Sequence, residues 1–283
     1  MTIRYYVPDL SDAAPGAMWT LSAEESNHAV RVMRIEAGQM VELFDGKCNV
    51  AAASVSSPNR RGTMVRIEQR KRLCNMPAVS VEVDVAFPKP ERCKEMIARL
   101  TELGVRCVTP IVCHRTQRPP SDSLLEKLRR GVIEACKQSG RNELMTIGSV
   151  VPFKERLKQI RVAGSNNTSF SGLIAHPGIV GSSQDQEPKQ ATGGLNNADA
   201  VKINDGHAVR VLVGPEGGFD DQEVVAAIGE GYRPVNLGTR IYRIETAAVV
   251  LASLVIHQSG MVPGIREDDG ATSVRTSPDG ENR

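Results

Sequence analysis

The first 75 residues alternate apolar and polar positions over short runs, which is the pattern of half-buried β-strands. Such runs cover residues 41–46, 51–57 and 63–69. The pairs Asp45-Gly46 and Pro58-Asn59 lie between the runs and favour turns. This spacing predicts a small antiparallel β-barrel or sandwich.

One helix is predicted within this strand-rich segment. Ser22 is followed three residues later by Glu25, and this spacing is typical of a capping box at a helix N-terminus. On a helical wheel the apolar positions Ala29, Val30, Val32 and Met33 share one side, and the remaining arc holds His28, Arg31 and Arg34. This basic arc is either a solvated helix face or a surface for nucleic-acid phosphates. The Arg-rich stretch at residues 60–72 is either a further surface for RNA or a solvated segment that flanks a linker.

From about residue 78 onward, apolar strands alternate with amphipathic helices. Apolar runs at residues 79–87 and 105–113 predict buried strands, and Pro90 is expected to begin the helix between them. This helix is expected to end at Gly104. Its apolar stripe consists of Cys93, Met96, Ile97, Leu100 and Leu103.

The same alternation continues to about residue 257. A long helix is predicted from Ser123, which has capping-box spacing to Glu126, as far as Gly140. Further strands are predicted at residues 146–151, 172–178, 208–214 and 234–238, with helices that begin at Pro152 and Asp220 and a final helix that ends near His257. This order predicts an α/β fold with a mostly parallel sheet and helices on both of its faces.

Two segments contain few large apolar residues. Residues 181–206 are predicted to be a flexible insertion, and residues 261–283 a disordered tail. The pattern therefore predicts a β-barrel domain at residues 1–75 and an α/β domain at residues 78–260.

The chain has 283 residues and a formal net charge of +2. Residues 1–160 carry 25 Lys and Arg against 18 Asp and Glu, whereas residues 161–283 carry 10 against 15. The first 160 residues are therefore the better candidate for contact with a polyanion. The chain has only five Phe, four Tyr and one Trp, which argues against a protein that binds single strands mainly by aromatic stacking.

The six cysteines show neither a CxxC pair nor the spacing of a zinc site. We expect them to be reduced thiols of a cytoplasmic protein without a bound metal. The longest uncharged apolar run, Thr246 to Ile256, is shorter than the roughly 20 residues that cross a bilayer, so neither membrane insertion nor secretion is expected.

A glycine-rich loop at residues 213–220 follows one predicted strand and precedes a predicted helix. Gly214, Gly217 and Gly218 allow a sharp turn and a close approach of the backbone to a ligand. Open α/β sheets bind ligands at the carboxyl ends of their strands. The loop is thus either a ligand cradle or a tight connection, and it matches neither the dinucleotide nor the Walker motif.

A second loop, at residues 237–247, precedes a helix that is apolar on almost every side. Such a helix is expected to be buried, in part within a subunit interface. Arg240, Arg243 and Glu245 lie just before or at its start. These charges either contact a ligand or form ion pairs with one another.

The two loops, LVGPEGGF at residues 212–219 and LGTRIYRIETA at residues 237–247, resemble the signature loops of the RsmE family. These proteins are the 16S ribosomal RNA uridine-N3 methyltransferases of the SPOUT superfamily. The stretch from His28 to Arg34, followed by GQMVELFDG, resembles the PUA-like barrel of the family. The resemblance covers roughly residues 3 to 259 and also includes the segments Thr101–Val105, Glu134–Arg141 and His176-Pro177.

The resemblance implies a SPOUT-type α/β fold whose parallel sheet is tied in a trefoil knot. The pattern of strands and helices alone would not lead to this prediction, because threaded chains are nearly absent from proteins. It also implies a homodimer, S-adenosylmethionine as methyl donor and 16S ribosomal RNA of the small ribosomal subunit as substrate.

The resemblance also suggests roles for individual residues. The cofactor site is expected to include Leu173, Ile174, His176, Gly214, Glu216, Gly217, Gly218, Leu237, Gly238, Ile241, Thr246 and Ala247. Arg243 is the candidate for stabilising negative charge on the uracil, and Glu245 for orienting Arg243 or acting as a base. Phosphate contacts are expected at His28, Arg31, Arg34, Arg115 and Arg141.

Two other functions are compatible with these motifs. A ribose 2'-O-methyltransferase of the same superfamily would share the knot, and a non-catalytic RNA-binding assembly factor would retain the fold without binding the cofactor. A Rossmann dehydrogenase is disfavoured, because no GxGxxG follows any predicted strand.

Overall fold

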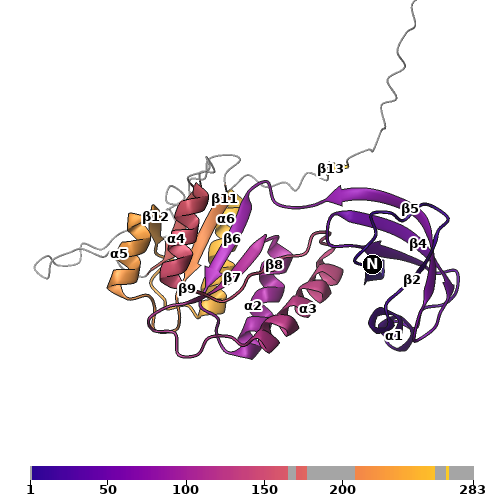
Figure 1. Cartoon of the computed structure of the whole chain (residues 1–283), viewed down its shortest axis with the longest axis horizontal. Coiled ribbons are helices and arrows are strands. Elements are labelled where there is room, and N and C mark those ends of the chain that lie inside the picture. Colours follow the sequence, from indigo (N-terminus) through magenta and orange to yellow (C-terminus); the bar gives the residue numbers. More distant parts are fainter. Residues whose placement is uncertain (1, 165–169, 177–207, 259–265, 268–283) are drawn as a thin grey trace, which may run out of the picture. The chain divides into compact units, whose positions relative to one another are not determined.

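The computed structural model describes residues 2–164, 170–176, 208–258 and 266–267. The chain divides into two compact units, which Figure 1 shows with their helices and strands labelled. The first unit comprises Met1–Cys74 and Ile265–Arg283, and the second comprises Asn75–Gly264. The predicted insertion at residues 181–206 lies outside the described residues.

The first unit is built on one curled sheet of six strands. These are β1 (Arg4–Tyr6), β2 (Met18–Thr20), β3 (Met40–Phe44), β4 (Asn49–Ser57), β5 (Met64–Cys74) and β13 (Arg266–Glu267). Their order is β1-β3-β4-β5-β13, with β2 also paired to β5, and every pair except β1–β3 is antiparallel. The described strands thus form an open curled sheet rather than a fully closed barrel. Strand β13 lies within the predicted tail, so the prediction of disorder is wrong for Arg266 and Glu267.

The predicted helix of this unit is shorter than its apolar pattern indicates. Helix α1 covers Ala23–Arg31, and Ser22 Oγ accepts a hydrogen bond from the backbone N–H of Glu25 at 3.2 Å. Ala29 packs in the core, but Val32 is 65% exposed and Met33 is 40% exposed. The apolar side of the helical wheel therefore does not continue as a buried face at these two residues, because the helix ends before them.

Two cysteines of the first unit are paired. Cys48 and Cys74 form a disulfide that joins the start of β4 to the end of β5. The backbone N–H of Leu73 donates to the Cys48 carbonyl at 2.8 Å, so strand pairing brings the two cysteines together across the sheet. The prediction of six reduced thiols is therefore wrong for this pair, whereas Cys93, Cys107, Cys113 and Cys136 are free.

The second unit contains a parallel sheet of seven strands. They are β6 (Ser80–Val85), β7 (Cys107–Val112), β8 (Thr146–Ile147), β9 (Val151–Pro152), β10 (Phe170–Ala175), β11 (Ala208–Val213) and β12 (Tyr232–Val235). The order is β12-β10-β11-β6-β7-β8, and β9 also pairs with β7. This sheet confirms the predicted α/β class, while the threading of the chain into a knot stays a prediction.

Five helices cover the sheet within the described ranges of this unit. They are α2 (Pro90–Leu103), α3 (Asp122–Ser139), α4 (Phe153–Gly164), α5 (Asp221–Gly229) and α6 (Ile244–Gln258). One face of the sheet packs against α6, which in turn contacts α2, and α3 packs on α2. On the other face, α4 and α5 pack over a cluster that includes Phe153, Ile174, Leu212 and Phe219.

The helix ends follow the local sequence closely. Gly104 adopts a left-handed φ of 91° and ends α2, as predicted. Helix α3 begins two residues earlier than predicted, because Ser121 rather than Ser123 accepts the backbone N–H of Leu124. The predicted start of α5 at Asp220 is confirmed by a capping box, in which Asp220 and Glu223 each accept the other's backbone N–H. In the part of the chain that the structure describes, we find no helix long and apolar enough to cross a membrane.

Candidate functional site

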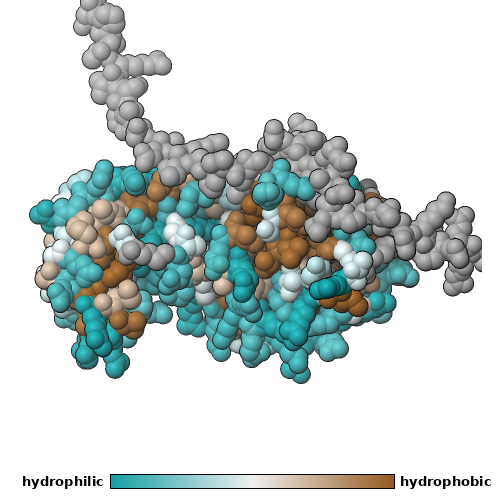
Figure 2. Space-filling view, turned by 180° about the vertical axis from the view of Figure 1, so that it is seen from behind, coloured by the Kyte–Doolittle hydropathy of each residue, from teal (hydrophilic) through white to brown (hydrophobic). Residues whose placement is uncertain are grey.

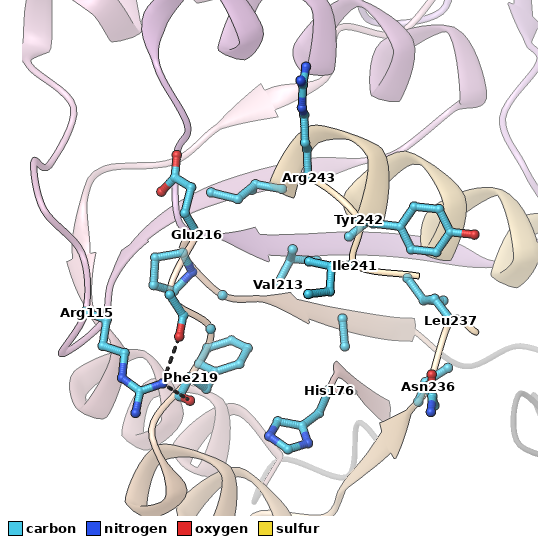
Figure 3. A pocket seen from close by; sticks show the side chains of 18 of the residues that line it. Arg115, His176, Val213, Glu216, Phe219, Asn236, Leu237, Ile241, Tyr242 and Arg243 are labelled. Atoms are coloured by element: carbon cyan, nitrogen blue, oxygen red, sulfur yellow. Dashed lines mark hydrogen bonds between the residues drawn. The ribbon is translucent and has the colours of Figure 1, made fainter. Parts of the chain in front are cut away.

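A cavity of about 590 Å³ lies at the carboxyl ends of β10, β11 and β12. Figure 3 shows it between the ends of these strands, the loops that follow β11 and β12, and the start of α6. The carboxyl edge of a parallel sheet is where open α/β folds bind ligands. We call it the loop cavity.

The β11–α5 loop forms one wall of the loop cavity with its backbone. At Gly214 a Cβ atom would lie 3.0 Å from the Phe219 ring and 3.1 Å from its backbone nitrogen. Gly218 adopts a φ of 68°, where an L side chain is strained. The loop thus needs glycine both for close packing and for its turn, which supports the interpretation as a cradle.

The β12–α6 loop forms the opposite wall. Gly238 adopts a φ of 120°, and its N–H donates to Asn236 Oδ1 at 2.9 Å. Ile241 is 96% exposed and Tyr242 40%, although both line the loop cavity. Exposed apolar side chains at a cavity are typical of a surface that a ligand or partner covers.

Arg115 ties a third loop to the cradle. It follows β7, and its Nη1 donates to the Gly217 carbonyl at 2.8 Å and to the Phe219 carbonyl at 3.4 Å, as Figure 3 shows. Beside it, the His114 N–H donates to Glu223 Oε1 at 2.8 Å. Arg115 therefore supports the cavity wall, and its predicted phosphate contact stays a prediction.

Nine of the twelve predicted cofactor residues line the loop cavity: His176, Gly214, Glu216, Gly217, Gly218, Leu237, Gly238, Ile241 and Ala247. Leu173 and Ile174 do not, because they are buried within β10 rather than at its carboxyl end. Thr246 lies on α6 beside Ala247 but is exposed and outside the lining.

The two candidate catalytic residues occupy different positions. Arg243 lines the loop cavity, and its carbonyl accepts the backbone N–H of Ala247 at 2.8 Å, but its guanidinium makes no hydrogen bond or ion pair with any residue that the structure describes. Glu245 does not line the cavity, and its Oε1 lies 3.7 Å from Nε of Arg92. The structure therefore places Glu245 beside Arg92. It shows no contact between the side chains of Glu245 and Arg243 that would support the expectation that Glu245 orients Arg243.

Sequence reasoning missed Arg92, which lines the same cavity from the first turn of α2. Helix α2 follows β6, whose carboxyl end lies at the same sheet edge as that of β11. This position in the order of strands and helices is the sequence signal that could have identified Arg92 as a residue of the cavity.

Arg141 is not placed to contact phosphates. It is 4% exposed, and its guanidinium donates to the carbonyls of Thr101 at 2.9 Å and Glu143 at 2.5 Å. Burial lowers the pKa of this guanidinium from its ordinary value. The predicted phosphate contact is wrong for Arg141, which joins α2 to the segment after α3.

The other residues predicted to contact phosphates, His28, Arg31 and Arg34, belong to the first unit, and both arginines are exposed there.

Comparison with known families identifies the family of this chain. Residues 75–256 match the family model described as an RNA methyltransferase domain, and residues 21–67 match the RNA methyltransferase PUA domain. The chain belongs to the RNA methyltransferase family. This membership confirms the resemblance seen in the two loop motifs.

Several relatives of this methyltransferase carry the name ribosomal RNA small subunit methyltransferase E. The protein from Synechocystis is 28% identical over 82% of this chain and 70% of its own length. The Bacillus subtilis protein is 24% identical over 87% and 92%, and the Mycobacterium tuberculosis protein 28% over 90% and 91%.

Solved structures show the same fold. A Legionella pneumophila protein named as a methyltransferase, in complex with S-adenosylmethionine, superposes with a TM-score of 0.74. It is 27% identical, and the match covers 90% of this chain and 97% of that one. A small subunit methyltransferase E from Neisseria gonorrhoeae, also bound to S-adenosylmethionine, gives a TM-score of 0.74 at 23% identity over 89% and 96%.

Proposed function

We propose that this methyltransferase transfers the methyl group of S-adenosylmethionine to N3 of a uridine in 16S ribosomal RNA of the small ribosomal subunit. The observation that carries the proposal is the loop cavity, in which three strand-end loops and the start of α6 enclose one space lined by several arginines. The names of the relatives and the cofactor in the Legionella structure support the reaction and the donor.

The residues around the loop cavity fit this cofactor. Gly214 and Gly217 leave no room for a Cβ without displacing Phe219 or Arg115, so the backbone itself would hold the nucleoside. Leu237, Ile241 and Ala247 offer apolar surface for an adenine ring. When bound, the cofactor's sulfonium supplies an electrophilic methyl group.

The buried thiols Cys93 and Cys113 argue against a pyrimidine carbon as the acceptor. Burial raises the pKa of the Cys93 thiol to about 12, and burial also raises the pKa of Cys113. Neither thiol lines the loop cavity, and burial favours the neutral thiol over the thiolate nucleophile that methylation at a pyrimidine carbon needs. Uracil N3 needs only to lose its proton and have the resulting charge stabilised.

Arg243 is proposed to stabilise that charge at the mouth of the loop cavity. Its guanidinium has no described partner that would compete with a substrate oxygen. We expect Arg243→Ala to lower turnover with little loss of cofactor affinity, measured by single-turnover kinetics and calorimetry. Equal turnover would remove Arg243 from the mechanism.

RNA binding is proposed for the exposed basic residues of the first unit. Arg31 and Arg34 are exposed on or just after α1, and His28 is partly exposed on the same helix. Their charges would contact phosphates and so position the RNA without reading its sequence.

We also propose that the protein acts in the cytoplasm and needs no metal, since the sulfonium already supplies the electrophile. Turnover is then expected to be unchanged by a chelator.

A homodimer is proposed from the surface of α6. Val249, Val250 and Leu254 are only partly buried within one chain, and Figure 2 shows hydrophobic residues gathered on the second unit in the view from behind. Leu254→Asp is expected to give a monomer by light scattering. The matched control, Val225→Asp on α5, is expected to stay dimeric, and a monomeric wild-type protein would contradict this part of the proposal.

The deciding experiment uses methyl-labelled S-adenosylmethionine and small ribosomal subunits that lack N3-methyluridine. After incubation, the RNA is digested and the labelled nucleoside identified. Label in N3-methyluridine supports the proposal. Label in a 2'-O-methyl nucleoside would replace the function while keeping the fold, and absence of cofactor binding would favour a non-catalytic RNA-binding factor.

A further inference from the structure

Arg92 is a cation of the loop cavity that pairs with a carboxylate. It belongs to the first turn of α2, lines the cavity, and has a side chain that is 37% exposed. Its Nε lies 3.7 Å from Oε1 of Glu245, which is at the start of α6. The pair joins two helices that pack against each other beside the cavity.

Glu245 is placed to act through Arg92 rather than on a substrate. Its side chain is 13% exposed and is absent from the cavity lining. Its Oε2 is buried and has no hydrogen-bond partner among the described residues. A carboxylate in the first turn of a helix is favoured by the helix dipole. Glu245 therefore supplies a fixed negative charge behind Arg92.

The charged groups around Arg92 come from three elements. Glu91 on α2, Glu216 on the β11–α5 loop and Glu245 on α6 all act electrostatically on the neighbouring Cys93 thiol. Arg243, another cation of the cavity lining, extends away from His176 and Phe219 in Figure 3. Of these carboxylates, Glu245 is the one that the structure pairs with Arg92, which remains accessible from the cavity.

We propose that Arg92 is a catalytic residue that binds a carbonyl oxygen of the acceptor uracil as N3 becomes anionic, and that Glu245 is its positioning residue. The inference rests on the proposed function. A planar guanidinium held on one side by a carboxylate can still offer its remaining N–H groups to an oxygen. The N3 proton passes to solvent, and the N3–methyl bond forms as the sulfur–methyl bond breaks, leaving a neutral thioether.

The charge of the reacting groups favours the uracil over the cofactor as the partner of Arg92. The carboxylate of the cofactor already carries its own ammonium group as a neighbour. The uracil gains negative charge only as it reacts, and a cation aimed at such charge accelerates the reaction.

The test compares Arg92→Ala, Arg92→Lys and Glu245→Gln with the matched control Arg99→Ala. Arg99 lies on the same helix and pairs with Glu95 at 2.8 Å, outside the cavity lining. Single-turnover rates on the small subunit are measured from about pH 6 to about pH 10, and cofactor affinity by calorimetry. Thermal melting shows that each variant is folded.

Arg92→Ala is expected to lower the single-turnover rate at pH 7 by about 100-fold, as for loss of one charge-stabilising donor. The pH profile should move to higher pH, because the uracil anion is less stabilised. Arg92→Lys should recover part of the rate, since it keeps the charge without the planar fork. Adding Glu245→Gln to Arg92→Ala should cause little further loss, as expected when both act as one unit.

Two results would overturn the inference while leaving the proposed function intact. One is an Arg92→Ala rate and pH profile equal to those of Arg99→Ala, with N3-methyluridine still formed by the wild type. The other is a loss confined to cofactor affinity, which would assign Arg92 to the cofactor carboxylate. If the wild type forms no N3-methyluridine, the proposed function and this inference fail together, and the wild-type product alone distinguishes that case.

Discussion

The Nε atom of Arg156 lies 3.0 Å from Oδ2 of Asp84, a carboxyl group with no exposed surface. The same guanidinium lies 3.8 Å from Glu82, which also pairs with Arg210 at 2.9 Å. Two carboxylates of the central strand β6 are thus neutralised by one arginine from α4 and one from β11. Because each carboxylate has a guanidinium partner, these charged side chains can be buried in the sheet whose strand ends form the loop cavity.

Replacing Arg156 by Met is expected to destabilise the second unit by about 3 kcal/mol at pH 7, because a buried carboxylate loses its partner. Burial raises the pKa of Asp84 above its ordinary value, although Arg156 opposes this shift. The native state therefore holds the proton more tightly than the unfolded state, and stability from this group falls as pH rises above the ordinary pKa. Removing Arg156 enlarges that effect.

The destabilisation by Arg156→Met should accordingly shrink as pH is lowered towards 5, where Asp84 can be protonated. Urea unfolding followed by circular dichroism at several pH values measures it. The double variant with Asp84→Asn should recover most of the lost stability. A penalty that does not change with pH would contradict the assigned role of Asp84.

Gly214→Ala is expected to weaken binding of S-adenosylmethionine at least about tenfold, equal to about 1.4 kcal/mol. The added Cβ would lie 3.0 Å from the Phe219 ring, so the β11–α5 loop must shift away from its position at the cavity. Calorimetry measures the affinity. Gly131→Ala on α3 is the control, because nothing lies within 4 Å of its Cβ, and it should leave affinity unchanged.

Arg31→Ala and Arg34→Ala should each reduce the salt dependence of RNA binding by about one unit of slope in log K against log salt concentration. Each removes one exposed cation from the first unit. Arg99→Ala is the matched control and should leave the slope as in the wild type. Filter binding over a range of salt concentrations measures the slope, and unchanged slopes in both variants would place the RNA elsewhere.

Reduction of the Cys48–Cys74 disulfide is expected to lower the stability of the first unit by about 3 kcal/mol, because the bond closes a loop with a sequence separation of 26 residues. Cys74→Ser should show the same loss without a reductant and no further loss with one. Thermal melting with and without reductant measures this, and alkylation followed by mass spectrometry reports the state of both thiols. A wild-type protein insensitive to reductant would show that the bond does not form in solution.

Several elements were readable directly from local sequence. Pro90 and Gly104 mark the ends of α2, and Asp220 with Glu223 marks the start of α5, because caps and backbone conformations depend on a few neighbouring residues. Local pattern failed where the chain leaves a helix, as at Val32 and Met33. Periodicity describes which side a residue would occupy in a helix and does not say where that helix ends.

The candidate site divides in the same way. Glycine spacing and the motifs of the two loops indicated eight of the nine predicted residues that line the loop cavity, because those eight lie within the motifs themselves, and His176 follows β10. The burial of Arg141 and the proximity of Cys48 to Cys74 depend on pairings between segments far apart in the sequence.

The sequence by itself determined the α/β class, the order of strands and helices and the two loops that carry the family motifs. Each of these follows from short-range periodicity, turn chemistry and motif spacing. Only the tertiary structure decided that Glu245 lies beside Arg92 rather than Arg243, and that Asp84 is paired with Arg156. Such partners are chosen by how helices pack on the sheet, which brings together charges that no local pattern connects.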